Sequence, residues 1–170
     1  AVRSDEEGQL GIDTWSPRQT LVDNVVAVAG GGAHTLTLRN DGTVWAWGYN
    51  NFGQLGDGTF LSRTQPVPVV QLTEGVAIAA GYGHSLALEK DGTVWAWGDN
   101  GFTQLGNGTT TDRNFPAQIA GLSNIVGVGA GASHSLAVVA NSRIGAWGRN
   151  FAGQVGDGTA TNRTTPVKIG

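Results

Sequence analysis

The stretch that decides the fold runs from Asp41 to Thr59 and reads DGTVWAWGYNNFGQLGDGT. Its pattern returns 50 positions later at 91–109 as DGTVWAWGDNGFTQLGNGT, and again at 141–159 as NSRIGAWGRNFAGQVGDGT. A shortened copy, Gly8-Gln9-Leu10-Gly11, lies 45 positions before the first complete GQLG. Self-similarity at a fixed period is the signature of a repeat architecture. We therefore expect the chain to consist of stacked copies of one structural unit.

Each copy contains four short segments with strand character. Val25–Ala29 is small and β-branched, and His34–Leu38 alternates apolar residues with period two. Asn40–Gly42 is a tight-turn sequence whose glycine supplies the positive φ that a hairpin requires. Thr43–Trp47 is rich in aromatic and β-branched residues, and after a glycine-punctuated loop the segment Pro66–Val69 reads as an edge strand. No segment has helical periodicity, so the fold class is all-β.

Four strands in each unit of about 50 residues predict a β-propeller, with about three four-stranded blades and an extra outer strand around Gln9–Leu21. The 28 glycines of the 170 residues fit this fold, because the innermost strands of a propeller crowd around its axis. Tryptophans farther out fill the wider gaps between blades, and we expect Trp97 to be one of them. The small inner residues are Ala27, Ala29, Gly30, Ala79, Ala80, Gly81, Gly127, Gly129 and Gly131.

Three motifs together resemble the repeat of the regulator of chromosome condensation (RCC1) family. They are AGYGHSLAL at 80–88, DGTVWAWG at 91–98, and the GQLGDGT that begins at Gly53. The resemblance extends from Gly8 to the end of the chain and implies blades of an RCC1-type propeller, which usually has seven. The third copy departs from the pattern at Asn141–Gly145, where NSRIG replaces DGTVW. We expect that blade to pack more loosely and its hairpin turn to differ.

The whole chain, 1–170, is expected to form one RCC1-repeat region. The first and last residues supply partial outer-strand segments, and three complete units lie between them. The predicted divisions are 1–11, 12–61, 62–111, 112–161 and 162–170.

Three blades in an arc leave two exposed faces with unpaired edges, which favour aggregation. Something must therefore complete the assembly. One interpretation is that the chain is a fragment of a longer propeller. The other is that copies of the chain associate as a homo-oligomer that closes the ring, because repeat surfaces are already complementary to one another. The sequence leaves both open.

The composition excludes several classes of function. The absence of cysteine excludes thiol nucleophiles, disulfides and cysteine-ligated zinc. A net charge of −3 gives no electrostatic footprint for nucleic acid, and no apolar run is long enough for a membrane helix. We therefore expect neither a nucleic-acid nor a membrane partner. The compartment stays unassigned, since a cysteine-free chain is compatible with a secreted or a cytoplasmic bacterial protein.

Histidine recurs immediately after the inner turn of every copy, at His34, His84 and His134. Imidazole can act as a base or a metal ligand, but no carboxylate or thiol lies near these residues at metal-ligand spacing. A residue that every repeat requires belongs to the blade rather than to one site. We expect His34 to bond a backbone group in the glycine turn of its own blade. We therefore predict no catalytic residue, no cofactor and no metal.

Arginine also recurs in every copy, at Arg63, Arg113 and Arg163. These residues could form a basic ring for an anionic partner, or each could pair locally with a carboxylate. Asp57 and Asp157 lie six residues before two of them, which favours local pairs.

The positions at which the copies differ are the candidates for partner recognition, because loops carry function while strands carry packing. Antiparallel connectivity places the turn after the first strand and the loop after the third strand on one face. Drift of solvated loop residues would give the same variation. Phe52 and Phe102 recur, and we expect them to pack under their own loops. The candidate partner-binding residues are Tyr49, Asn51, Tyr82, Asp99, Arg149 and Phe151.

Three functions remain. The first is a non-catalytic scaffold for protein–protein interaction, with an unknown protein partner. The second, implied by the RCC1 resemblance, is a guanine-nucleotide exchange factor for a small GTPase, although the blades carry no long insertion. The third is a propeller-type inhibitor of a secreted enzyme such as a β-lactamase. The RCC1-like inhibitors of that type share the Ala-Trp-Gly strand but lack the full GQLG-x-GT signature seen here.

Overall fold

The computed structural model describes residues 22–140 and 143–169. These residues form three four-stranded antiparallel sheets, each made of four consecutive strands in chain order. Sheet 1 contains β1 (Val25–Gly30), β2 (His34–Arg39), β3 (Val44–Gly48) and β4 (Arg63–Pro68). Sheet 2 contains β5 (Gly75–Ala80), β6 (His84–Glu89), β7 (Val94–Gly98) and β8 (Arg113–Gln118). Sheet 3 contains β9 (Ile125–Ala130), β10 (His134–Val139), β11 (Arg143–Gly148) and β12 (Arg163–Ile169).

The turn between the second and third strands of sheet 1 forms for local reasons. The Asp41 carboxylate accepts hydrogen bonds from the Thr43 amide at 3.0 Å and from the Thr43 hydroxyl at 2.6 Å. Gly42 follows with φ of 82°, a left-handed conformation that other residues adopt only with strain. The same arrangement recurs at Asp91 in sheet 2. The corresponding residues of sheet 3, 141–142, lie outside the described part of the chain.

Register gives each sheet two different faces. In sheet 1, Leu36 is paired with Ala46, and this pair lies on the face that Leu38 shares. Thr35 is paired with Trp47, and this pair lies on the opposite face. The same division holds in sheets 2 and 3, where serine pairs with tryptophan. Each sheet therefore has a leucine-bearing face and an opposite, tryptophan-bearing face, and sheet 2 presents one to each of its two neighbours.

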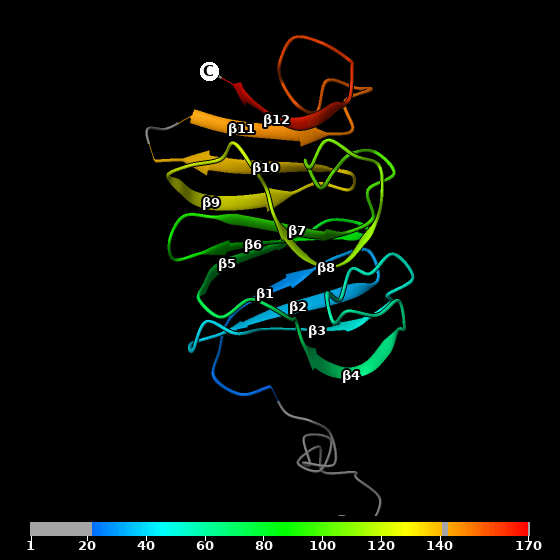
Figure 1. The fold of residues 1–170 in the computed structure, drawn as a ribbon, viewed down its shortest axis with the longest axis vertical. Helices are drawn as coiled ribbons and strands as arrows, with labels where there is room; N and C mark the ends of the chain where they lie inside the picture. Colours follow the sequence, from blue (N-terminus) through cyan, green and yellow to red (C-terminus); the bar gives the residue numbers. More distant parts are fainter. Residues whose placement is uncertain (1–21, 141–142, 170) are drawn as a thin grey trace, which may run out of the picture.

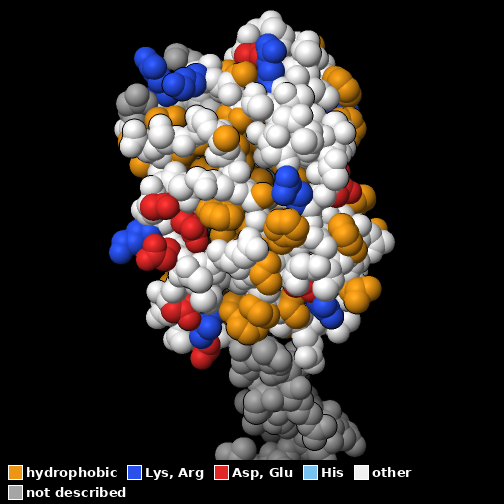
Figure 2. All heavy atoms as spheres, in the orientation of Figure 1, with side chains coloured by type: hydrophobic (Ala, Val, Ile, Leu, Met, Phe, Trp, Pro, Cys, Tyr) orange, Lys and Arg blue, Asp and Glu red, His pale blue; other side chains and the backbone are white. Residues whose placement is uncertain are grey.

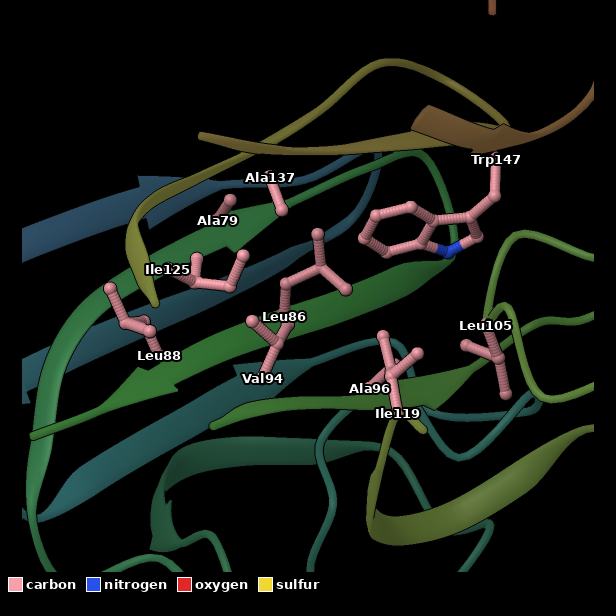
Figure 3. Close-up of a cluster of buried hydrophobic side chains, with 10 residues drawn as sticks. All are labelled: Ala79, Leu86, Leu88, Val94, Ala96, Leu105, Ile119, Ile125, Ala137 and Trp147. Carbon is pink, nitrogen blue, oxygen red and sulfur yellow. The ribbon is translucent and has the colours of Figure 1, made fainter. Parts of the chain in front are cut away.

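The sheets are stacked along the long axis of the molecule, with sheet 2 between the other two (Figure 1). The inner strand β5 contacts both β1 and β9, so the first strands of the sheets converge. Between sheets 1 and 2, the leucine-rich face of sheet 1 packs on Ala87 and Trp97. Figure 3 shows the equivalent core between sheets 2 and 3, where Leu86, Val94 and Trp147 come together. Stacked four-stranded blades with converging inner strands form a partial β-propeller, which confirms the predicted fold.

The predicted outer strand around Gln9–Leu21 lies outside the described residues. The predicted repeat boundaries between residues 61 and 62 and between 111 and 112 fall shortly before β4 and β8. A repeat unit divided in this way would be offset from a sheet by one strand. The division into units stays a prediction.

The glycines at the inner strands and turns occur for more than one physical reason. A Cβ on Gly81 or Gly131 would overlap the imidazole ring of the following histidine, so the ring itself requires glycine there. A Cβ on Gly127 would lie 3.8 Å from Val138, an ordinary contact, and one on Gly30 would meet nothing within 4 Å. Crowding between inner strands therefore does not explain Gly30 or Gly127 within these three sheets.

Candidate interaction face

One side of the molecule carries both the inner turns and the long loops, as expected from the connectivity. The amide of Tyr49 donates to the carbonyl of Ala33 at 2.8 Å, which ties the loop after β3 to the turn after β1. Asp99 and Arg149 make the same bond in sheets 2 and 3. We call this side the loop face, and it comprises the turns 31–33, 81–83 and 131–133 and the loops 49–62, 99–112 and 149–162.

A buried asparagine organises each long loop, and the sequence interpretation missed it. The side-chain amide of Asn50 donates to the carbonyls of Thr59 and Leu61 at 3.1 and 3.0 Å, and its oxygen accepts from the Leu55 amide at 2.9 Å. Asn100 and Asn150 make equivalent bonds and are likewise completely buried. Recurrence at every fiftieth position was the available signal. These bonds hold the loops in one conformation, so the face is preorganised.

The recurrent arginines form local ion pairs where a carboxylate is available. Arg63 contacts Asp57 at 2.9 Å, and Arg163 pairs with Asp157, as the spacing predicts. A hydrogen bond from the Thr159 hydroxyl, together with Arg163, lowers the pKa of Asp157 to about 2. The middle copy has asparagine at 107, and its Arg113 lies 5.9 Å from the ring centre of Phe115 instead. Two of the three arginines therefore stabilise their own loops.

Two of the three histidines, His34 and His84, bond across a blade boundary. His34 Nε2 is 2.9 Å from the hydroxyl of Ser85 in the next sheet, and that hydroxyl donates to the carbonyl of Gln54 at 2.8 Å. Because the serine has one proton to donate, the imidazole must carry its proton on Nε2, and Nδ1 is bare. The expected bond to a backbone group of its own glycine turn was wrong. The imidazole ring of His34 packs against the inner turn of its own blade, and its Nε2 points across the blade boundary to Ser85.

Burial controls the ionisation of these rings. Desolvation lowers the pKa of His34 from its ordinary 6.5 to about 4. Desolvation, with smaller repulsion from the neighbouring histidines, lowers the pKa of His84 to about 3. Both rings are therefore neutral at pH 7.

Four of the six predicted partner-binding residues fall into two clusters on the loop face. Tyr49 and Tyr82 line one pocket, together with Phe52, Ala33 and Gln54. Tyr49 packs edge-on against Phe52, with 6.0 Å between the ring centres. Tyr82 is 68% exposed, which makes it one of the most exposed aromatic side chains of the described residues. We call this pocket the Tyr49–Tyr82 pocket.

The second cluster contains Arg149 and Phe151. The guanidinium of Arg149 lies 4.9 Å from the ring centre of Phe102 and 5.3 Å from that of Phe151. The two phenylalanine rings meet edge-on at 6.1 Å. Phe102 therefore contacts the next blade rather than packing only under its own loop, which the sequence did not predict. Arg149 is half-buried, and Asp99 at the equivalent position of sheet 2 is also half-buried.

Asn51, the remaining predicted residue, is exposed and lines neither cluster. Figure 2 shows hydrophobic side chains on the side where the long loops lie in Figure 1 and across the middle of the molecule, with single charged side chains among them. The loop face therefore combines exposed aromatic rings with isolated charges, the composition typical of protein-binding surfaces.

The described residues contain no group of three or more histidine, cysteine, aspartate or glutamate side chains placed to hold a metal ion. Within residues 22–140 and 143–169 no helix is long and apolar enough to cross a membrane.

Comparison with known families gives a consistent match. A sequence profile described as "Regulator of chromosome condensation (RCC1) repeat" matches residues 41–88 and 91–138. A second profile with the same description matches residues 25–54 and 76–104. Among curated relatives, the ultraviolet-B receptor UVR8 of Arabidopsis thaliana is 45% identical over 42 residues, which are 25% of this chain and 10% of the receptor.

Solved structures agree with this match. Prp20p from Saccharomyces cerevisiae, described with its binding properties to Gsp1p and histones, has a TM-score of 0.77 and 27% identity. The match covers 86% of this chain and 38% of Prp20p. Human WBSCR16 has a TM-score of 0.78 at 24% identity, covering 90% of this chain and 40% of that protein, and supports the fold alone. This chain spans well under half the length of each.

Proposed function

Because this chain belongs to the RCC1 repeat family, we propose that it is a non-catalytic scaffold that binds a protein partner through its loop face. The observation that carries the proposal is the exposure of aromatic side chains there. Tyr49, Tyr82 and Phe151 are 40%, 68% and 59% exposed on loops that buried asparagines hold in place. Aromatic residues and arginine contribute most of the binding energy in protein interfaces.

Removing these aromatic side chains is expected to abolish partner binding. A variant carrying Tyr49→Ala, Tyr82→Ala and Phe151→Ala should capture at least tenfold less partner than the unmodified chain in quantitative affinity capture from the source cell. The reason is that the side chains that anchor the partner have been removed. The matched control is Glu74→Ala with Lys90→Ala, which changes exposed residues near the hairpin turns on the opposite side. If every captured protein binds the loop-face variant and the control equally, the loop face is not the binding surface.

The likeness to Prp20p favours a second candidate. RCC1 resemblance implies exchange of guanine nucleotide on a small GTPase, and Prp20p is described with binding to Gsp1p. Release of a fluorescent guanine nucleotide from such a GTPase, accelerated by this chain, would favour exchange activity over a plain scaffold. Inhibition of a secreted enzyme such as a β-lactamase stays a separate prediction, for which a direct activity assay is the test.

The outer face of sheet 3 supports a proposal about assembly. Val138 and Ile144 are each 43% exposed, whereas Leu88 and Val94, their equivalents in sheet 2, are 3% and 0% exposed under sheet 3. An apolar sheet face of this kind is normally covered. We propose that a further four-stranded sheet of the same kind covers it in the complete assembly.

Light scattering across a dilution series tests this assembly proposal. A mass of two or more chains would identify a second copy as the cover. A single-chain mass with strong binding of a hydrophobic dye would assign the cover to further blades of a longer chain. A single chain that binds no dye would contradict the proposal, because the face would then be stable in water.

A further inference from the structure

The two clusters on the loop face lie at successive blade boundaries and share one equivalent aromatic position. Phe52 corresponds to Phe102, and Asp99 corresponds to Arg149, each 50 positions apart. At the boundary between sheets 2 and 3, the Arg149 guanidinium lies against two aromatic rings. That boundary therefore contains its own cation, bound by aromatic faces.

At the boundary between sheets 1 and 2, Phe52 stands at the position of Phe102, but Gly101 stands at that of Phe151. Tyr49 and Tyr82 supply the other aromatic rings there, and no lysine or arginine of the described residues lines the pocket. Tyr49, Phe52 and Tyr82 line a pocket of about 340 Å³ there. The residue at the arginine position is Asp99, whose shorter side chain carries the opposite charge. The pocket thus has three aromatic side chains where the second boundary has two, and no cation from the described part of the chain lies among them.

Asp99 lies next to this pocket. A Cβ on Gly83 would be 3.2 Å from Asp99 Cβ and 3.4 Å from a ring carbon of Phe52. The side chains of Asp99 and Phe52 therefore both lie beside Gly83. Asp99 Oδ1 accepts a hydrogen bond from the Gly101 amide at 2.9 Å. No ion pair of Asp99 with a residue of the described part of the chain is present. The carboxylate therefore keeps charge available for a ligand.

A second carboxylate strengthens the negative potential. Burial raises the pKa of Asp112, and the charge of Asp99 raises it further, although a hydrogen bond from the Asn100 amide opposes the rise. Asp99 and Asp112 therefore lie close enough to repel each other. A cation near Asp99 would relieve this repulsion.

We propose that the Tyr49–Tyr82 pocket binds an arginine side chain of the partner protein, held by the three aromatic rings and by Asp99 as Arg149 is held by Phe102 and Phe151. A guanidinium is planar and stacks on aromatic faces while it donates to a carboxylate, which matches both parts of the site. This inference rests on the proposed function, because it names the partner group that the loop face recognises.

The test uses N-acetyl-arginine methylamide as the probe in an NMR titration of the whole chain. Saturable shifts are expected at the backbone amides of Ala33, Tyr49, Tyr82 and Gly83. The citrulline analogue has the same shape without the charge and should shift these amides at least tenfold less at equal concentration. Equal saturation by citrulline would overturn the proposal, and so would stronger binding of the lysine analogue than of the arginine analogue.

A substitution can place an arginine side chain of the chain itself in the pocket. Asp99→Arg places at the first boundary the residue that Arg149 provides at the second, and it should reduce probe binding at least tenfold. Asp99→Asn, which keeps the size of the side chain, should weaken binding several-fold and shows whether the effect depends on charge. Phe115→Ala, at an exposed aromatic residue of β8, is the matched control and should leave binding unchanged. Unchanged probe binding by Asp99→Arg, with the chain still folded by its amide spectrum, would overturn the inference.

The two proposals can fail separately. If the triple loop-face variant loses its partner but the arginine probe never saturates, the scaffold function stands and the arginine pocket is wrong. If the probe saturates but no partner depends on the loop face, the pocket stands without the proposed function.

Discussion

Replacing Trp97 with alanine is expected to lower the free energy of unfolding by about 3–5 kcal/mol, the usual cost of truncating a large buried aromatic side chain. Trp97 is fully buried between sheets 1 and 2, and its indole Nε1 donates to the carbonyl of Gln54 at 2.9 Å. The ring lies so close to Gly56 that a Cβ there would be 2.7 Å from Nε1. The substitution would therefore open a cavity and leave the Gln54 carbonyl with one donor fewer.

Urea unfolding, followed by far-UV circular dichroism, measures this loss. Trp47→Ala is the matched control, because Trp47 occupies the same position of β3 and is paired in register like Trp97 but is only half-buried. We expect the control to lose less than half as much stability as Trp97→Ala. Equal losses for the two variants would show that burial between blades does not determine the effect.

The sequence predicted the sheets well because the signals for them are local. Alternation in His34–Leu38, the turn at Asp41–Gly42 and the period of 50 all act within one unit, and the structure confirms the four-stranded blades that they indicate. The burial of Trp97 also followed from its place on the third strand. The ion pair between Asp57 and Arg63 followed from their spacing in one loop.

Relations between blades could not be obtained in the same way. The partner of His34 is Ser85, 51 positions later, and periodicity within a unit does not specify how two units face each other. The same limit applies to Phe102, whose contacts with Arg149 and Phe151 cross a blade boundary. Arg149 was placed on the loop face by its loop position, but its half-buried state depends on that boundary.

The candidate interaction face was identified in outline because the loop positions vary while the scaffold does not. The arrangement of three aromatic side chains around one pocket required coordinates, since Tyr49 and Phe52 come from sheet 1 and Tyr82 precedes β6 of sheet 2. The contrast between Asp99 and Arg149 was visible in the sequence. Its meaning became clear only when Arg149 was found against aromatic rings.

Acidification from pH 7 to pH 5 is expected to destabilise the protein through its buried histidines. The folded state lowers the pKa of His34 to about 4 and that of His84 to about 3, whereas the unfolded chain has the ordinary 6.5. Below pH 6.5 the unfolded state therefore binds protons that the folded state does not, and stability falls as the pH falls. At pH 5 the expected loss is about 2 kcal/mol for each of these two rings, from 1.36 kcal/mol per pKa unit.

The dependence of stability on pH separates this effect from the carboxylates. Hydrogen bonds from Thr159 and Arg163 lower the pKa of Asp157 to about 2, so its stabilising contribution is lost only below its ordinary 3.8, outside the window from pH 7 to 5. His84→Gln should reduce the slope of unfolding free energy against pH by roughly a third to a half in that window, because burial lowers the pKa of His134 as well as that of His34. Urea midpoints at several pH values measure the slope. An unchanged slope would mean that His84 takes up a proton on Nδ1 while folded, keeping its Nε2–H bond to Ser135, and that burying the resulting charge carries little cost.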